Sequence, residues 1–278
     1  MSFLAETGAR LGRAAGHLGF GVGPPAGSGW VRLDELVVSG LLDRVAEDLR
    51  ARQGRGDVAG SYLGSHVAVP FVASTVAALV VDGRCPDPDP SNVSVHLHDA
   101  GWFDGVRFLE PRAAVLPDDP AAGQPGTVVV ADAAALRQWW AEAITAALCP
   151  MLEAVRARLP YARRGLWGSV ADRVAGVALT AGRGAGRPGA EGWAVATELL
   201  DALAAHAPVR LTRPSPLRVT SPTGREGWFP IRGTCCLYYL TVEGPDPCGD
   251  GYCTTCPFTD PDHRQRRLAA WLDEEAEP

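Results

Sequence analysis

The chain contains 278 residues, 46% of them hydrophobic and 21% charged, and its formal net charge is −6. This composition is typical of a soluble globular protein with one large domain or two modest ones, and it excludes a disordered chain. The acidic balance also argues against a nucleic-acid-binding protein.

Two helices and four short strands are predicted in the first half of the chain. Ser39 is placed to cap a helix with apolar residues from Leu41 to Leu49, and Gly54 is placed to end it. A second, more apolar helix is expected from about Tyr62 to Val81, bent or entered at Pro70. Alternating apolar residues then predict strands at Val93–Leu97, Trp102–Leu109 (with Asp104-Gly105 as a turn signal), Ala113–Leu116 and Thr127–Val130.

The second half is predicted to be mainly helical. Apolar residues at three- and four-residue spacing indicate a helix from Asp132 to Leu148, and Pro150 is expected to open a separate segment that reaches Leu159. Two helices and two extended pieces follow, at Leu166–Val177, Trp193–Leu203, Val209–Thr212 and Leu217–Thr220. We therefore expect an α+β fold with a mixed helix and strand region at 1–130, a mainly helical region at 131–230 and a cysteine-rich segment at 231–278.

The sequence also indicates the compartment. Residues 1–20 contain Glu6 and lack the continuous apolar run of a secretory signal. The most apolar stretch, Val67–Val81, is interrupted by Pro70 and is shorter than the ~20 residues that a membrane span requires. Seven cysteines, an odd number, fit a reducing compartment better than a disulfide framework. We therefore expect a cytoplasmic protein without an integral membrane segment.

Five of the seven cysteines lie within 22 residues, as Cys235-Cys236, Cys248 and Cys253-Thr-Thr-Cys256-Pro257. Four thiolates can hold a [2Fe–2S] or [4Fe–4S] cluster, or a structural zinc ion. The Cys-x-x-Cys spacing lets two sulfurs converge on one metal across a tight turn. The adjacent pair is less ordinary, because neighbouring side chains in a strand point to opposite faces, so the backbone must turn there. Zinc sites normally use spaced pairs, and the adjacent pair therefore favours an iron–sulfur cluster.

The residues Ile231–Tyr239 (IRGTCCLYY), followed by Cys253-Thr-Thr-Cys256-Pro257, resemble the C-terminal signature of FhuF-type ferric-siderophore reductases. The segment Leu166–Ala171 and the apolar helix around Ser61–Leu79 are similar to upstream parts of the same family. The likeness is specific near the cysteines and loose elsewhere. In the family motif about ten residues separate the two cysteine pairs. Here 16 residues lie between Cys236 and Cys253, and they include Cys248.

This resemblance implies that Cys235, Cys236, Cys253 and Cys256 hold a [2Fe–2S] cluster. Cys248 is an alternative ligand, because its distance in sequence from Cys236 is closer to that in the family. We favour Cys253 and Cys256, since only they form an x-x pair followed by proline.

The resemblance also implies an oxidoreductase that reduces a ferric siderophore, expected to be of the hydroxamate type, by one outer-sphere electron and so releases Fe(II) in the cytosol. A ferredoxin or a flavoprotein would supply the electron, and Arg264, Arg266 and Arg267 are candidate docking residues for that donor. Two alternatives stay open: a non-catalytic domain whose structural zinc site serves protein interaction, and an iron–sulfur electron carrier or sensor.

Overall fold

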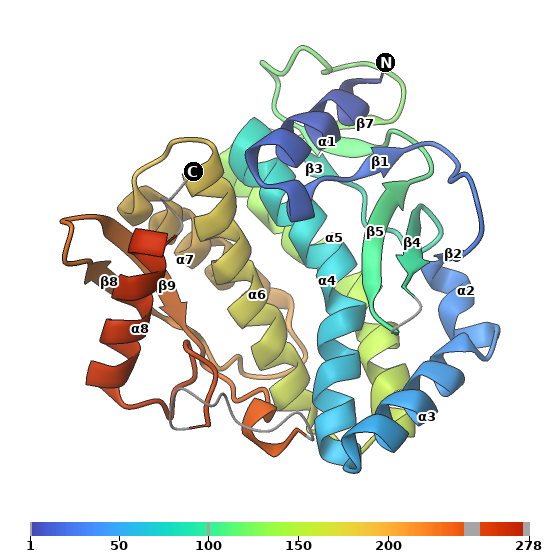
Figure 1. The fold of residues 1–278 in the computed structure, drawn as a ribbon. Coiled ribbons are helices and arrows are strands. Elements are labelled where there is room, and N and C mark those ends of the chain that lie inside the picture. Colours follow the sequence, from blue (N-terminus) through green and yellow to red (C-terminus); the bar gives the residue numbers. More distant parts are fainter. Residues whose placement is uncertain (1, 99–100, 242–250, 275–278) are drawn as a thin grey trace.

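The computed structural model describes residues 2–98, 101–241 and 251–274 (Figure 1). Long helices form its centre, and strands lie on either side of them, so the fold is α+β, as predicted. The central helices are α3 (Leu41–Gln53), α4 (Gly56–Asp82), α5 (Ala133–Arg158), α6 (Arg163–Gly184) and α7 (Gly189–His206).

Helix α4 lies in the middle of the molecule and packs along α6 (Figure 1). By length and composition it could cross a membrane, but 78% of its most apolar window is buried among the other elements. A helix that is apolar on every face must be buried on every side in a globular protein, and α4 meets this requirement. Trp140 of α5 is fully buried and donates its indole N–H to Thr75 Oγ1 of α4 at 3.0 Å. The polar atom of this large core side chain is therefore satisfied.

Three small sheets accompany the helices. In the first, which has the order β1–β5–β4–β2, β4 pairs antiparallel with β5 and with β2, whereas β1 pairs parallel with β5. The second has the order β3–β6–β7, and the third is the antiparallel hairpin β8–β9. The strands are β1 (Gly21–Val22), β2 (Trp30–Arg32), β3 (Cys85–Pro86), β4 (Val93–Leu97), β5 (Phe103–Phe108), β6 (Ala113–Val115), β7 (Thr127–Val129), β8 (Ser215–Thr220) and β9 (Glu226–Ile231).

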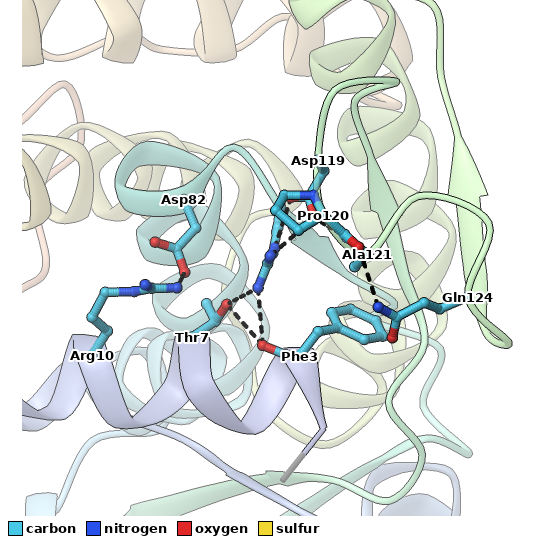
Figure 2. A network of polar contacts seen from close by, with 9 residues as sticks. Phe3, Thr7, Arg10, Asp82, Asp119, Pro120, Ala121 and Gln124 are labelled. Atoms are coloured by element: carbon cyan, nitrogen blue, oxygen red, sulfur yellow. Dashed lines mark hydrogen bonds and ion pairs between the residues drawn. The ribbon is translucent and has the colours of Figure 1, made fainter.

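A buried ion pair fixes helix α1 (Phe3–Ala14) against the loop between β6 and β7. Arg84 and Asp119 meet at 2.7 Å, and each side chain is less than a tenth exposed. Arg84 also donates to the carbonyl oxygen of Phe3 at 3.0 Å and to the hydroxyl of Thr7 at 3.2 Å. Figure 2 shows Phe3 and Thr7 on α1 facing Asp119 of the loop. Because a buried charge is costly unless it is paired and hydrogen-bonded, this network holds α1 in one position.

A second, smaller apolar core joins the β8–β9 hairpin to helix α8 (Pro261–Glu274). It contains Val219, Phe229, Leu268 and Ala269. In Figure 1 this unit lies beside α6 and α7, away from the β1–β5–β4–β2 sheet. The sequence pattern predicts β8 but neither β9 nor α8. Most of α8 is polar, and its few apolar residues form a face only large enough to cover one hairpin.

Two expectations for the first half of the chain are wrong. A short helix, α2 (Leu33–Val38), precedes α3, so Ser39 follows the end of α2 and the N-cap of α3 is Gly40, whose φ is 72°. Asp104 and Gly105 form no turn, because both lie inside β5, with Gly105 opposite His96 of β4. The change of chain direction occurs before β5 instead.

One expectation for the second half is also wrong. Pro150 opens no new segment, because α5 continues through it from Ala133 to Arg158. The residues around it, Leu148 and Met151, are buried, and their packing outweighs the one backbone hydrogen bond that a proline removes from a helix.

Candidate metal centre

The four predicted ligands come from two turns that lie side by side. Cys235 and Cys236 follow β9 and precede the short 3-10 helix η2 (Tyr238–Leu240), and Cys253 and Cys256 precede α8. The Sγ atoms of Cys236 and Cys253 are 3.9 Å apart. Burial raises the pKa of Cys235, and the neighbouring Cys256 and Cys236 thiols raise it further. The structure thus brings the two cysteine turns together, with Cys236 and Cys253 in contact across them.

The backbone turns directly after the adjacent cysteines, as the sequence argument requires. Leu237 has φ 62°, and it is the one non-glycine residue with positive φ in the described parts of the chain. Its N–H donates to Cys235 Sγ at 3.5 Å. A left-handed conformation costs a residue with a Cβ about 1–2 kcal/mol, so packing around the turn must offset this strain.

The Cys253–Cys256 turn is closed by hydrogen bonds to its carbonyl oxygens. The N–H of Cys256 donates to the Cys253 carbonyl at 2.8 Å, and the Thr259 hydroxyl donates to the same oxygen at 3.0 Å. Arg264 donates to the carbonyl oxygens of Cys256 and Thr259 at 2.7 and 2.8 Å. This arginine is only 6% exposed. The prediction that Arg264 docks an electron donor is therefore wrong, because its guanidinium faces inward and braces the turn.

Helix α6 anchors the Cys235–Cys236 turn through Asp172. This carboxylate accepts hydrogen bonds from the backbone N–H groups of Gly233 and Thr234 at 2.7 and 3.3 Å, and it lies 3.3 Å from Arg232 Nε. The N–H of Arg232 donates to the Thr255 carbonyl at 2.9 Å. One buried carboxylate and one arginine therefore connect the core helix to both cysteine turns.

Three other residues from the helical core also support the cysteine turns. Ser61 of α4 donates its hydroxyl to the Cys236 carbonyl at 3.0 Å, and Tyr161 donates to the Cys235 carbonyl at 3.0 Å. Gly168 of α6 leaves room for Thr234, because a Cβ there would lie 1.8 Å from Thr234 Oγ1. Ser61 and Gly168 fall in the segments whose resemblance to the reductase family the sequence suggests. Tyr161 and Asp172 carry no sequence signal, because their partners lie more than sixty residues away.

Burial and charge set the protonation of this site. Burial raises the pKa of Asp172 to about 6, although Arg232 and the two N–H donors lower it. The hydrogen bond with Cys253 lowers the pKa of Cys236 to about 6, with a further contribution from the positive charge of Arg232. The pKa of Cys253 is raised by the same hydrogen bond and by its buried position. The site thus favours a thiolate at Cys236, and the thiolate is the form of cysteine that binds metals.

The four thiols supply the ligands that either type of metal centre requires. No three His, Cys, Asp or Glu side chains among the described residues are grouped to hold one metal ion. Cys236 and Cys253 are in contact across the two turns, with their Sγ atoms 3.9 Å apart. A two-iron cluster requires two protein ligands on each iron, whereas a structural zinc ion requires four around one point. Two adjoining turns that each supply two thiols fit the ligand set of a [2Fe–2S] cluster, and they also supply the four ligands of a zinc site. Cys248 lies outside the described residues.

No curated protein matches the chain. A family described as "Ferric iron reductase FhuF-like transporter" matches residues 71–219, just over half of the chain. The matched part runs from α4 to β8 and includes Asp172, but it ends before the cysteine turns. This match confirms the resemblance that the sequence motifs indicate, and the chain belongs to the FhuF-like ferric iron reductase family.

Proposed function

We propose that this protein is a cytosolic [2Fe–2S] oxidoreductase that reduces a ferric siderophore by one electron. The family description points to ferric iron reduction. The observation that supports the cofactor is the meeting of the two cysteine turns, where the Sγ atoms of Cys236 and Cys253 lie 3.9 Å apart. When bound, the cluster would supply a one-electron centre; iron–sulfur centres as a class span about −700 to +450 mV, according to cluster type, net charge, hydrogen bonds and solvent exposure.

The residues around the thiols would hold the cluster and adjust its charge. Asp172 and Arg232 fix the Cys235–Cys236 turn, and Arg264 fixes the Cys253–Cys256 turn. The guanidinium of Arg232 places a positive charge beside Cys236 and Cys253, which favours the thiolate form of the ligands. A positive charge and hydrogen bonds close to the ligands also favour the reduced state of an iron–sulfur centre, because that state carries one more negative charge.

The proposed reaction needs no general base or nucleophile. A siderophore of the hydroxamate type, or a similar one, binds Fe(III) through hard oxygen donors and holds Fe(II) far more weakly. Adding one electron to the Fe(III) chelate therefore gives Fe(II) and the free chelator, which takes up protons from water. The protein's task is to bring the ferric chelate close to the cysteine turns and to accept electrons from a ferredoxin or flavoprotein.

A reoxidation experiment tests this function against that of an iron–sulfur carrier. Protein reduced with dithionite under anaerobic conditions and freed of excess reductant is mixed with a ferric tris-hydroxamate. We expect reoxidation with about one Fe(II) trapped per electron stored, since each cluster exchanges one electron. The iron-free hydroxamate serves as the control and should leave the protein reduced. If the ferric chelate does not reoxidise the reduced protein, but another redox protein accepts its electrons, the protein is an electron carrier instead.

A further inference from the structure

A cleft of about 920 Å³ lies between α6, β9 and α8. Gly176 and Arg183 line it from α6, Trp228 from β9 and Trp271 from α8. Figure 1 shows these three elements next to one another, with α8 in front of β9 and beside α6. The volume falls in the range of about 300–1,000 Å³ that is typical of sites for small ligands.

The cleft extends to the cysteine turn. Thr254, which is bonded to Cys253, lines the cleft. Thr255, the other residue between Cys253 and Cys256, lines a smaller cavity of about 250 Å³ together with Asp172. The two cavities share Gly176, Thr180 and Pro230 among their lining residues, so they adjoin along α6 and the end of β9. A molecule in the cleft would therefore lie one residue away from a predicted ligand.

The lining of the cleft combines aromatic faces with arginine. The guanidinium of Arg183 lies 5.2 Å from the centre of the Trp271 ring, and Phe229 packs edge-on against Trp271 at 5.5 Å. Arg267 adds a second positive charge, and Glu274 a negative one. Aromatic walls cover an apolar chelator backbone, while guanidinium groups donate to partly negative oxygens. This combination suits the oxygen-donor face of a metal chelate.

The smaller cavity adds a polar group. The hydroxyl of Ser169 lines this cavity and is buried, and it makes no hydrogen bond to any other described residue. Ser169 is 7% exposed. A buried hydroxyl without a protein partner is costly, and it is available to a ligand oxygen that reaches past Gly176.

We propose that the cleft between α6, β9 and α8 binds an oxygen-donor Fe(III) chelate, with Arg183 and Trp271 as contact residues and Thr254 beside the electron-transfer site. This inference rests on the proposed function for the identity of the chelate. It assigns to the reductase a substrate site on the α8 side of the cysteine turns, formed by the C-terminal hairpin and helix together with α6.

Gallium(III) tris-hydroxamate allows binding to be tested without electron transfer, because Ga(III) resembles Fe(III) in charge and size but is not reduced under these conditions. Isothermal titration calorimetry with the purified full chain measures the dissociation constant. Gallium(III) tris-catecholate provides a second arm with a more negative chelate. We expect at least one of the two to bind, because both present oxygen-donor faces to the arginines.

Gly176 offers a matched pair of variants. A Cβ at this position would meet only Pro230 Cγ, at 4.0 Å, so Gly176→Ala should fold normally and bind within about twofold of wild type. Gly176→Leu should project a side chain into both cavities and weaken binding by more than about tenfold. Arg183→Gln should weaken it by about tenfold through loss of a charge-assisted contact. Arg44→Gln, on the exposed surface of α3, should leave binding unchanged.

The results separate this inference from the proposed function. Binding that Gly176→Leu and Arg183→Gln weaken supports the cleft, even if the reduced wild type is not reoxidised by a ferric chelate. Binding of neither gallium chelate, or binding that neither variant changes while both remain folded by circular dichroism, would overturn it. Reoxidation by ferric chelate at the wild-type rate in Gly176→Leu would likewise overturn the cleft and leave the reductase function standing.

Discussion

Asp172 shows how one buried residue can organise the candidate site. Its carboxylate receives two backbone N–H groups of the cysteine turn and faces Arg232, whose own N–H reaches the other turn. Burial raises the pKa of Asp172 to about 6, so the network rather than solvent keeps this side chain charged at neutral pH. Removing one partner of a buried hydrogen-bonded pair typically lowers the free energy of unfolding by more than the intact pair contributes to it. The stability of this network should therefore be sensitive to substitution.

His66 of α4 gives a prediction at the same scale. Burial lowers its pKa to about 4 from 6.5, and the charges of Arg173 and Arg52 lower it further. Its Nδ1 is buried and has no hydrogen-bond partner among the described residues. The folded protein therefore keeps this imidazole neutral while the unfolded chain binds a proton. The stability that this contributes is complete above pH 6.5 and is lost as the pH falls toward 4.

His66→Leu should remove this pH dependence. Between pH 7 and pH 4 the free energy of unfolding of wild type should fall by about 3 kcal/mol more than that of the variant. Urea unfolding of both proteins at pH 7, 5.5 and 4 measures the difference. Parallel pH profiles for the two proteins would show that His66 titrates normally in the folded state.

At the scale of elements, α1 depends on a buried ion pair for its position. Arg84 contacts Asp119 and two groups of α1 (Figure 2). Arg84→Met leaves the Asp119 carboxylate buried without its partner, so we expect a loss of about 3–5 kcal/mol in the free energy of unfolding. Thermal and urea unfolding check this value.

Arg32→Met provides the matched control for Arg84→Met. Arg32 pairs with Asp34 at the same 2.7 Å, but the two side chains are 43% and 35% exposed. Exposed pairs contribute about 0–1 kcal/mol, so this variant should be nearly neutral. Equal losses in the two variants would mean that the burial of Arg84 and Asp119 has no energetic effect.

The elements that the sequence predicts well are those with a strong local pattern. The spacing of apolar residues identifies α4, α6 and α7, and the helix predicted from Asp132 is α5, in which Asp132 is the N-cap. The pattern fails where distant packing decides. Pro150 remains inside α5 because its neighbours in that helix, Leu148 and Met151, are buried in the core. Helix α8 and strand β9 depend on each other for their small core, and neither has a strong pattern alone.

At the scale of the whole molecule, the cysteine motif predicts the site, but only the fold identifies its supports. The sequence predicts the four ligands and a turn of the backbone at the adjacent cysteines, and the structure brings the two cysteine turns together through Cys236 and Cys253. It does not predict Tyr161 or Asp172, because each contacts the cysteine turn across more than sixty residues of chain. The family match covers the helical part that supplies Asp172, while the thiols lie beyond it.

The pairing of thiols from two turns is the feature on which this account rests. Anaerobically purified protein is therefore assayed for iron, acid-labile sulfide and zinc, and its visible spectrum is recorded. Cys253→Ser and Cys248→Ser are assayed in parallel, because Cys253 contacts Cys236, whereas Cys248 is only an alternative ligand. We expect reddish-brown wild type with about two irons and two sulfides per chain, loss of colour in Cys253→Ser and unchanged colour in Cys248→Ser. Colourless protein with about one zinc per chain would contradict this expectation.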